Sequence, residues 1–405
     1  MKDVLKIAVL GLGGRGTMLV RDELVNMKDA EVAVVCDLYE DRMQHVADIV
    51  ADKTGKRPAM MADYREVLKT DVDAVIIATA WEPHVDIACA AMEAGKYVGL
   101  EVGGAYSVTD CWRLVHTYER TGTKLMFLEN CCYGKRELMA LHMVRQGLFG
   151  DVVHCSGGYC HDLREEVANG EENRHYRLRN YLHRNCENYP THELVPIGKI
   201  LNINDGNRFV SLTSTASCAK GLHTYCVENK GADHALSRAQ FAQGDIVTTV
   251  IKCANGETVT ITLDTTLPRS YSRGFTIRGT KAAYFEDTDS FFFDNEHHAY
   301  EFNGRGLWGN AAQYEEQHLH PIWQNYDGSG SHDGMDHLML RAFIEVASQD
   351  IEPPIDVYDA ATYMSITALS EQSIAEGSAP QAIPDFTGGK FCNRAPYPKT
   401  KYALR

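Results

Sequence analysis

The residues best placed to do chemistry lie at 188–193, where the sequence is Asn-Tyr-Pro-Thr-His-Glu. Tyr189 and His192 precede an apolar helical pattern, and such a pair can converge on one hydroxyl group, the histidine polarising it and the tyrosine relaying a proton. A lone histidine is more often a structural residue, but the preceding segment 162–190 is polar and rich in Arg, Asn, His and Tyr. We predict that this segment is a functional loop over a cleft, with a plain surface excursion as the alternative.

A second candidate site is the glycine-rich turn at residues 11–16. Its sequence Gly-Leu-Gly-Gly-Arg-Gly fits the G-x-G-x-x-G pattern, follows the apolar run LKIAVL and precedes a helical pattern. Such a turn lets a pyrophosphate approach the backbone N–H groups at the start of a helix. The residues expected to bind the dinucleotide here are Gly11, Gly13, Gly14, Arg15 and Gly16.

The end of the next predicted strand indicates which dinucleotide is bound. Asp37 follows the run EVAVVC, about 20 residues past the last glycine, where a carboxylate accepts hydrogen bonds from a ribose 2′-hydroxyl and repels a 2′-phosphate. The sequence therefore favours NAD over NADP. The alternative is a glycine turn and a solvated aspartate without a cofactor.

Further polar side chains follow later strands of the same predicted sheet. Thr79, Trp81 and His84 come after a buried strand, at the edge where open α/β sheets bind ligands. We expect them near the cofactor, with Trp81 and His84 on the nicotinamide side. Packing at a helix start, with Pro83 in the first turn, is an equal alternative.

The next two strands end in carboxylates. Glu101 ends one of them and Glu129 the other, with Asn130 directly after it. Buried carboxylates need partners, so acidic residues at consecutive strand ends favour a functional crevice. We assign Glu101 and Asn130 to the cofactor and expect Glu129 to face the same crevice.

The remaining histidines do not indicate a metal centre. Neither the pair His297 and His298 nor the pair His318 and His320 has a carboxylate or cysteine at dependable ligand spacing. We predict that the protein holds no metal.

The elements that must position these residues fall into two domains. Over residues 1–130, the apolar runs LKIAVL, EVAVVC, DAVIIATA, KYVGL and KLMFL alternate with helical patterns, which predicts an α/β Rossmann domain with a doubly wound parallel sheet. Over residues 131–405, longer amphipathic strands predict an α+β domain with a large, mostly antiparallel open sheet that serves substrate binding and oligomerisation. Its strands are expected at 152–159, 209–216, 246–251, 258–263 and 275–278, and its late helices at 336–348 and 357–375.

Composition excludes several classes of protein. The 405 residues carry a formal charge of −15, which argues against a nucleic-acid partner. Twelve cysteines without paired CxxC motifs fit a reducing compartment, and no apolar run approaches the ~20 residues that span a bilayer. We expect a cytoplasmic protein that binds neither nucleic acid nor membrane, and a homodimer or homotetramer.

The chain resembles the Gfo/Idh/MocA family of sugar and inositol oxidoreductases in its glycine turn, its strand-end Glu101 and its predicted two-domain order of strands and helices. More specific stretches resemble its NAD-dependent glycosidase branch, glycoside hydrolase family 109, represented by α-N-acetylgalactosaminidases. These stretches are 90–102, 128–150, 154–164, 189–196, 265–282 and 356–386.

The resemblance implies a reaction in which tightly bound NAD is recycled. The sugar is oxidised at carbon 3, the proton on carbon 2 becomes acidic, the aglycone leaves by elimination, water adds and the sugar is reduced again. Neither a pair of glycosidic carboxylates nor release of NADH is then required. The residues implied to face the substrate are Glu129, Tyr159, Tyr189, His192 and Tyr271, and His332 and Asp333 resemble a loop near the cofactor and sugar.

The chain departs from the family patterns at two points. Glu101-Val102-Gly103 replaces the Glu-Lys-Pro of ordinary dehydrogenases. Valine cannot move a proton, so this substitution resembles the glycosidase branch. Glu193 replaces the glycine of Thr-His-Gly, which predicts a carboxylate beside the sugar and, with the short loop 164–174, an altered sugar or aglycone preference. The alternatives are an NAD-dependent sugar or inositol dehydrogenase and a non-catalytic NAD- or sugar-binding regulator.

Overall fold

The computed structural model describes residues 3–298 and 303–404, which divide into two compact units. The first unit comprises the chain up to Lys135 together with Pro321–Ala361 and Ala395–Leu404. The second comprises Arg136–His320 and Thr362–Arg394. Two late segments thus belong to the first unit. The predicted division into 1–130 and 131–405 assigns both of them to the second domain.

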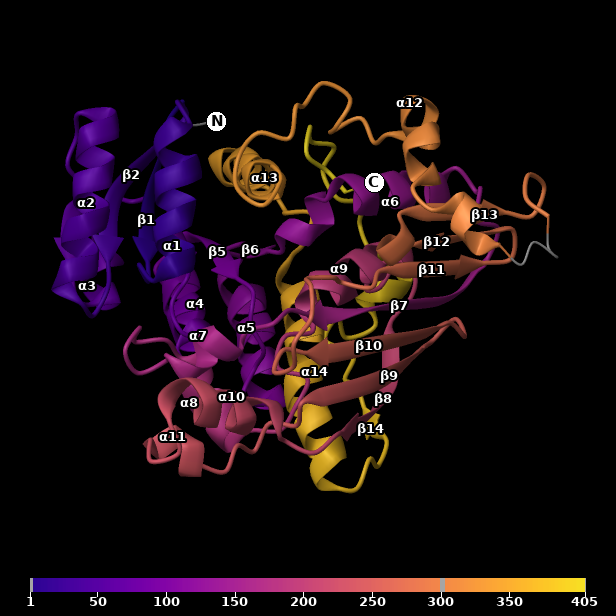
Figure 1. Ribbon diagram of the computed structural model, residues 1–405. Helices are drawn as coiled ribbons and strands as arrows, with labels where there is room; N and C mark the ends of the chain where they lie inside the picture. The colour runs from indigo at the N-terminus through magenta and orange to yellow at the C-terminus, as the bar shows by residue number, and fades with distance from the viewer. Residues whose placement is uncertain (1–2, 299–302, 405) are drawn as a thin grey trace. The chain divides into compact units, whose positions relative to one another are not determined.

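The first unit is built on a parallel six-stranded sheet in the order β3-β2-β1-β4-β5-β6 (Figure 1). Its strands are β1 (Leu5–Leu10), β2 (Ala30–Cys36), β3 (Ala59–Met61), β4 (Ala74–Ile77), β5 (Tyr97–Glu101) and β6 (Leu125–Leu128). All pairings are parallel, which confirms the predicted Rossmann sheet. The order reverses between β1 and β4, where such sheets place ligands. The strand β3 was not predicted because its apolar run, Ala-Met-Met, is only three residues long and largely exposed.

Helices cover this sheet, and one of them comes from the late part of the chain. They are α1 (Gly14–Met18), α2 (Glu40–Thr54), α3 (Tyr64–Val67), α4 (His84–Glu93), α5 (Val108–Thr121), α13 (Met335–Gln349) and the start of α14 (Val357–Ala375). Helix α13 packs against β1 and β6. A Cβ atom on Gly99 of β5 would lie 3.0 Å from the ring of Phe343, so this glycine lets α13 approach the sheet.

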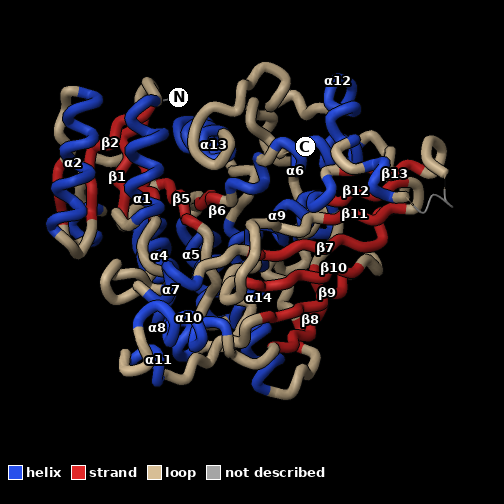
Figure 2. Tube along the Cα trace, in the orientation of Figure 1, coloured by secondary structure: helices blue, strands red, loops and turns tan. Residues whose placement is uncertain are grey.

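The second unit contains an eight-stranded sheet in the order β13-β12-β11-β7-β10-β9-β8-β14, drawn in red in Figure 2. Its strands are β7 (Val152–Cys160), β8 (Phe209–Ala216), β9 (Ile246–Cys253), β10 (Thr258–Asp264), β11 (Thr276–Gly279), β12 (Ala282–Phe285), β13 (Ser290–Phe293) and β14 (Gln381–Ala382). Only the pairing of β7 with β10 is parallel among these described strands, which confirms the mostly antiparallel sheet. Buried and exposed residues alternate along β9, as expected for a sheet with one covered face.

Helices of the second unit pack around this sheet. They are α6 (Lys135–Arg145), α7 (Arg164–Ala168), α8 (Arg177–His183), α9 (Thr191–Ile200), α10 (Gly221–Lys230), α11 (Ala235–Arg238), α12 (Glu315–His318) and the rest of α14. The segment 162–190, expected to be a loop, instead contains the short helices α7 and α8, whose few apolar residues give no clear helical periodicity. Helix α9 packs directly against β7.

Short helical turns of other types join these elements. They are η1 (Leu19–Glu23), η2 (Leu24–Asn26), η3 (Asn130–Tyr133), η4 (Glu286–Thr288), η5 (Gly304–Leu307), η6 (Asn310–Tyr314) and η7 (Lys390–Asn393). Among the described residues, no helix has the length and apolar character needed to cross a bilayer.

Candidate functional site

The glycine turn after β1 is shaped by two glycines and left open by two others. Gly11 has φ +89°, and a Cβ atom there would lie 2.5 Å from the backbone nitrogen of Thr79. A Cβ atom on Gly16 would collide with the carbonyl oxygen of Gly11. At Gly14 a Cβ atom would meet nothing within 4 Å, and at Gly13 only Arg42 at 3.7 Å. The backbone at Gly13 and Gly14 is therefore accessible to a ligand, as a pyrophosphate-binding turn requires.

Asp37, at the end of β2, holds this turn in place. One carboxylate oxygen accepts a hydrogen bond from the backbone N–H of Leu12 at 2.6 Å, and the other accepts one from Tyr39 at 3.0 Å. The half-buried carboxylate thus lies directly beside the glycine turn. Since each carboxylate oxygen can accept more than one hydrogen bond, Asp37 can also bind a ribose hydroxyl.

Arg15 does not extend from the turn towards a ligand but forms an ion pair with Asp336 of α13. Its two terminal nitrogens donate to the Asp336 carboxylate at 2.7 and 2.8 Å, and its Nε donates to Glu101 at 3.1 Å. The side chain assigned to the cofactor is therefore used within the protein, and Arg15 offers a ligand its backbone N–H.

Asp336 is the centre of this network and was not predicted as a functional residue. It also accepts hydrogen bonds from Asn130 at 2.9 Å and Ser331 at 2.8 Å, and contacts Nδ1 of His332 at 2.7 Å. Burial alone would raise the pKa of Asp336, but His332 and Arg15 outweigh it and hold the pKa well below its usual value. Sequence could not reveal this anchor because Arg15 lies 321 positions away from it.

Other predicted cofactor residues share the same surroundings. Glu101 is buried, and burial raises the pKa of its carboxyl although Arg15 partly offsets the effect. The Asn130 side chain is hydrogen bonded to Asp336. Of the predicted loop residues, His332 contacts this network, whereas Asp333 is exposed.

The side chains of Trp81 and His84 are buried by packing, the alternative that the sequence left open. A Cβ atom on Gly103 would lie 2.5 Å from the Trp81 indole, so the glycine after Val102 makes room for this ring. Nε2 of His84 donates to the carbonyl oxygen of Thr79 at 3.1 Å, and burial lowers the pKa of His84 to about 4. Both residues stabilise the turn between β4 and α4.

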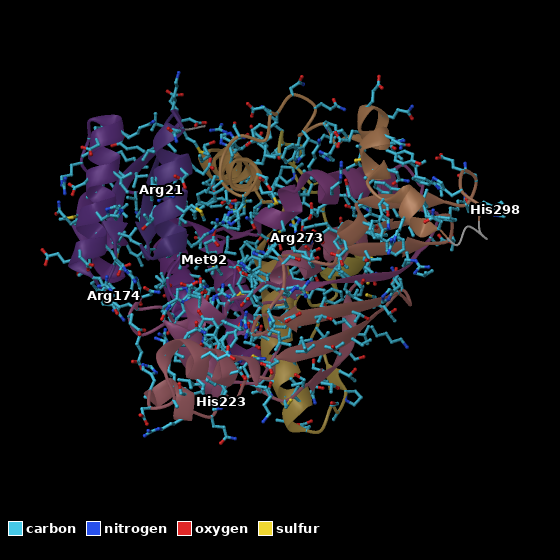
Figure 3. The ribbon with its side chains drawn as sticks, in the orientation of Figure 1. Arg21, Met92, Arg174, His223, Arg273 and His298 are labelled. Atoms are coloured by element: carbon cyan, nitrogen blue, oxygen red, sulfur yellow. The ribbon has the colours of Figure 1, made fainter. Side chains whose placement is uncertain are left out.

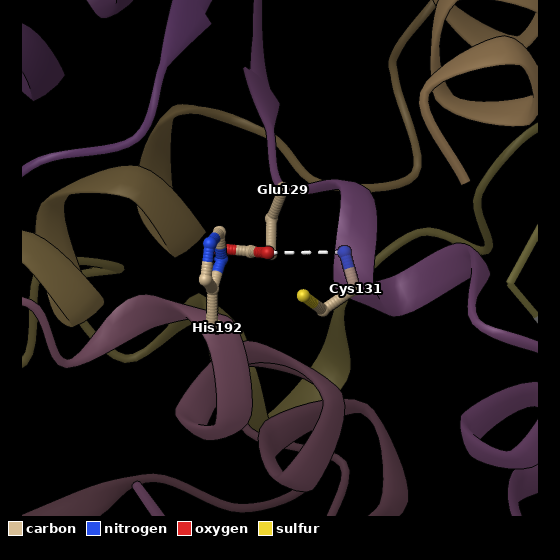
Figure 4. Close-up of side chains that lie close together, drawn as sticks. All are labelled: Glu129, Cys131 and His192. Carbon is tan, nitrogen blue, oxygen red and sulfur yellow. Dashed lines mark hydrogen bonds between the residues drawn. The ribbon is translucent and has the colours of Figure 1, made fainter. Parts of the chain in front are cut away.

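Glu129 follows β6 in the first unit and is fully buried. Its Oε1 accepts a hydrogen bond from the backbone N–H of Cys131 at 3.1 Å, drawn as a dashed line in Figure 4. This bond caps η3 and fixes the direction of the carboxylate.

In the second unit, four of the five predicted catalytic residues come together. Tyr159 is the second-last residue of β7, Tyr189 and His192 flank the start of α9, and Tyr271 lies in the segment after β10. The Tyr159 ring centroid is 4.3 Å from that of Tyr189, 5.5 Å from that of His192 and 6.5 Å from that of Tyr271. With His161, these residues form a group that we call the aromatic cluster.

His161 joins the aromatic cluster although the sequence analysis missed it. Its ring centroid lies 5.2 Å from that of Tyr271, and its Nδ1 is 3.1 Å from the Tyr159 hydroxyl. Burial and the nearby Arg177 guanidinium lower the pKa of His161, so the imidazole is neutral at pH 7 and can exchange a proton with Tyr159. The alternation of β7 could have indicated it, since His161 lies two residues after Tyr159.

Arg177 is a second residue that the sequence analysis did not single out. It is the first residue of α8, it is buried, and its guanidinium lies 5.1 Å from the ring centroid of Tyr189 and 5.8 Å from that of Tyr159. An ion pair with Glu166 at 2.9 Å holds it there. The segment 162–190 thus places a cation against the aromatic cluster.

Glu193, which the sequence predicts to lie beside the sugar, has its carboxylate in an ion pair. Its side chain is buried and lies 3.1 Å from the guanidinium of Arg273. A Cβ atom on Gly157 of β7 would lie 2.5 Å from the Glu193 Cβ, so this glycine makes room for the glutamate. Because adjacent residues of a helix point about 100° apart, His192 faces the cluster while Glu193 faces the sheet.

Comparisons with known proteins agree with this arrangement. Residues 5–128 match the oxidoreductase family with an NAD-binding Rossmann fold, and residues 133–393 match the C-terminal domain of glycosyl hydrolase family 109. An α-N-acetylgalactosaminidase from Tannerella forsythia is 37% identical over 97% of this chain and 88% of its own length. A glycosyl hydrolase family 109 protein from Stenotrophomonas maltophilia is 38% identical over 96% of this chain and 91% of its own.

Solved structures share the fold at much lower identity. A levoglucosan dehydrogenase in complex with NADH and levoglucosan has a TM-score of 0.69 at 16% identity, covering 94% of this chain and 99% of its own. An oxidoreductase from Agrobacterium radiobacter in complex with NAD⁺, L-tartaric acid and magnesium has a TM-score of 0.66, also at 16% identity, covering 94% of this chain and 98% of its own.

Proposed function

Because this chain belongs to glycoside hydrolase family 109 and carries its NAD-binding Rossmann domain, we propose that it is an α-N-acetylgalactosaminidase-like glycosidase that retains and recycles NAD. The observation that carries the proposal is the aromatic cluster. Four residues from three segments of the second unit, Tyr159, Tyr189, His192 and Tyr271, meet in a chain that is 37% identical to an α-N-acetylgalactosaminidase.

The first unit has the features that NAD requires. The backbone at Gly13 and Gly14 is open, and Asp37 presents a carboxylate beside the same turn. These residues would hold the pyrophosphate and the ribose, and the carboxylate would disfavour the 2′-phosphate of NADP. When bound, NAD supplies the hydride acceptor and donor that carbon 3 of the sugar needs at the start and end of the cycle.

The residues of the aromatic cluster would move the protons. We assign Tyr189 and His192, whose ring centroids lie 4.8 Å apart, to the carbon 3 hydroxyl, with His192 taking its proton. Tyr159 or Tyr271 would serve the carbon 2 proton and the leaving oxygen of the aglycone. Neutral His161, 3.1 Å from the Tyr159 hydroxyl, would return Tyr159 to its starting protonation state.

The residues after β5 favour a glycosidase over a net dehydrogenase. Ordinary dehydrogenases of the Gfo/Idh/MocA family use a lysine here, whereas this chain has Val102 between the buried Glu101 and Gly103. Valine cannot serve the oxidised hydroxyl. Elimination driven by the transient ketone needs only the proton-transfer groups of the aromatic cluster.

A panel of nitrophenyl α- and β-glycosides tests the proposal. We expect nitrophenol release from one α-glycoside, without stoichiometric growth of the NADH absorbance, whether or not NAD⁺ is added to protein purified with its cofactor. NADH growth on free sugars without aglycone release would instead establish a dehydrogenase. Binding of sugar without either reaction would establish a regulator.

A further inference from the structure

The residue that follows His192 lies in a buried ion cluster that also reaches the segment of Tyr271. Arg273 is the cation of this cluster and is labelled in Figure 3. Its guanidinium lies 2.5 Å from Glu137 of α6, 3.1 Å from Glu193 of α9 and 3.4 Å from Glu286 of η4. Arg273, Glu137 and Glu193 are all buried, which makes such ion pairs sensitive to the loss of one partner.

Two members of this cluster are close in sequence to the aromatic cluster. Glu193 directly follows His192 in the first turn of α9, and Arg273 lies two residues after Tyr271. A shift of the Glu193–Arg273 pair would therefore move the backbone that carries both rings. Glu137 also contacts Arg273, but it lies in α6 and is not adjacent in sequence to any residue of the aromatic cluster, so it has no direct connection to His192.

The same segment is held to β7 by backbone hydrogen bonds. Cys160 and Ser272 exchange N–H···O=C bonds at 3.0 and 3.2 Å, which places Tyr271 beside Tyr159 and His161. This bridge fixes Tyr271 relative to β7 but does not reach α9. The Glu193–Arg273 pair adds a direct side-chain link between the segment of Tyr271 and α9, beside the packing of α9 on β7.

We infer that Glu193 and Arg273 are positioning residues that set the distance between His192 and Tyr271. The packing of α9 on β7 supports this role. A Cβ atom on Gly157 would lie 2.5 Å from the Glu193 Cβ, so this glycine provides the space in which the Glu193 side chain reaches Arg273. The inference rests on the proposed function only in the experiment that measures glycosidase turnover.

The test compares two substitutions that remove a carboxylate from the same guanidinium. Glu193→Gln and Glu137→Gln both neutralise a buried partner of Arg273, so we expect similar losses of thermal stability. Misplacement of reacting groups reduces kcat, and we expect Glu193→Gln to lower kcat about tenfold or more while KM changes little. Glu137→Gln should stay within about twofold of the wild type.

A second readout does not need turnover. In protein labelled with ¹³C at the histidine ring, the His192 signal is identified by its loss in His192→Gln. We expect Glu193→Gln to shift this signal and Glu137→Gln to leave it in place. If the wild type shows no glycosidase turnover, the proposed function fails, and the His192 signal still decides this inference.

The inference would be overturned if the two substitutions had equal effects on kcat and on the His192 signal, or if neither had an effect. Arg273 and its carboxylates would then be a purely structural ion cluster. Should Glu193→Gln fail to fold, Glu193→Asp keeps the charge but withdraws it from Arg273 by one methylene. The same selective shift of the His192 signal is expected in that variant, and its absence would also overturn the inference.

Discussion

At the scale of single residues, Glu187 is unusual because its fully buried carboxyl lies two residues before Tyr189 of the aromatic cluster. Burial raises the pKa of Glu187 to about 8, although the backbone N–H of Tyr189 partly offsets the effect. The folded protein therefore holds a proton that the unfolded chain, with a glutamate pKa of about 4.3, has already released. By linkage, this group favours folding fully below about pH 4 and progressively less as the pH rises towards 8.

We predict that Glu187→Gln removes this dependence. A pKa that differs by one between the folded and unfolded chains corresponds to about 1.4 kcal/mol, so the variant should gain on the order of a few kcal/mol of stability relative to the wild type between pH 5 and pH 8. Thermal melts across this range measure the difference. Glu165→Gln, at an exposed position, should show the same pH profile as the wild type, and a parallel profile for Glu187→Gln would contradict the assignment.

At the scale of elements, the turn between β1 and α1 separates the packing roles of glycine from the binding roles. A Cβ atom on Gly16 would collide with the carbonyl oxygen of Gly11, whereas one on Gly14 would enter open space. We predict that Gly16→Ala lowers the melting temperature and weakens NAD binding together. Gly14→Ala should keep the melting temperature of the NAD-free protein and weaken only NAD binding, because its methyl group would occupy the space of the pyrophosphate.

Calorimetric titration with NAD⁺ and melts of the NAD-free protein distinguish the two variants. Unchanged NAD affinity in Gly14→Ala would show that the pyrophosphate does not approach this part of the turn. A normal melting temperature in Gly16→Ala would mean that the turn can rearrange around the added methyl group.

At the scale of the whole molecule, the first compact unit is assembled from distant parts of the chain. Arg15 pairs with Asp336, the backbone N–H of Phe127 donates to Ile355 at 2.9 Å, and Phe343 packs on Gly99. A fragment of residues 1–135 would lose all these contacts. We predict that it unfolds without a cooperative transition, because a partly buried arginine without its aspartate, an unpaired strand and an uncovered apolar sheet face would remain.

Joining residues 321–361 to this fragment through a flexible linker should restore a cooperative melt, monitored by circular dichroism. A sharp transition of the 1–135 fragment alone would show instead that α13 contributes little to folding of the Rossmann sheet. The same fused fragment carrying Asp336→Asn should melt at a lower temperature, because Arg15 would lose its buried anionic partner.

The sequence by itself determined the class of both sheets and the glycine turn with Asp37, and it named four residues that the fold brings together. These features follow from local patterns. Parallel buried strands have continuous apolar runs, antiparallel strands alternate, and a pyrophosphate-binding turn needs glycines at fixed spacing. The tyrosines and His192 were found through family motifs, and the structure shows that Tyr159, Tyr189, His192 and Tyr271 form one cluster.

Only the tertiary structure decided which partners those residues have. Arg15 binds Asp336 and Glu193 binds Arg273 because folding brings together residues that are far apart in the chain, and no spacing rule connects them. The tertiary structure also decided burial, since Trp81 and His84 pack inside the first unit and Glu193 is buried against Arg273. A residue's type limits the chemistry available to it, whereas its burial and its neighbours determine which of that chemistry it performs.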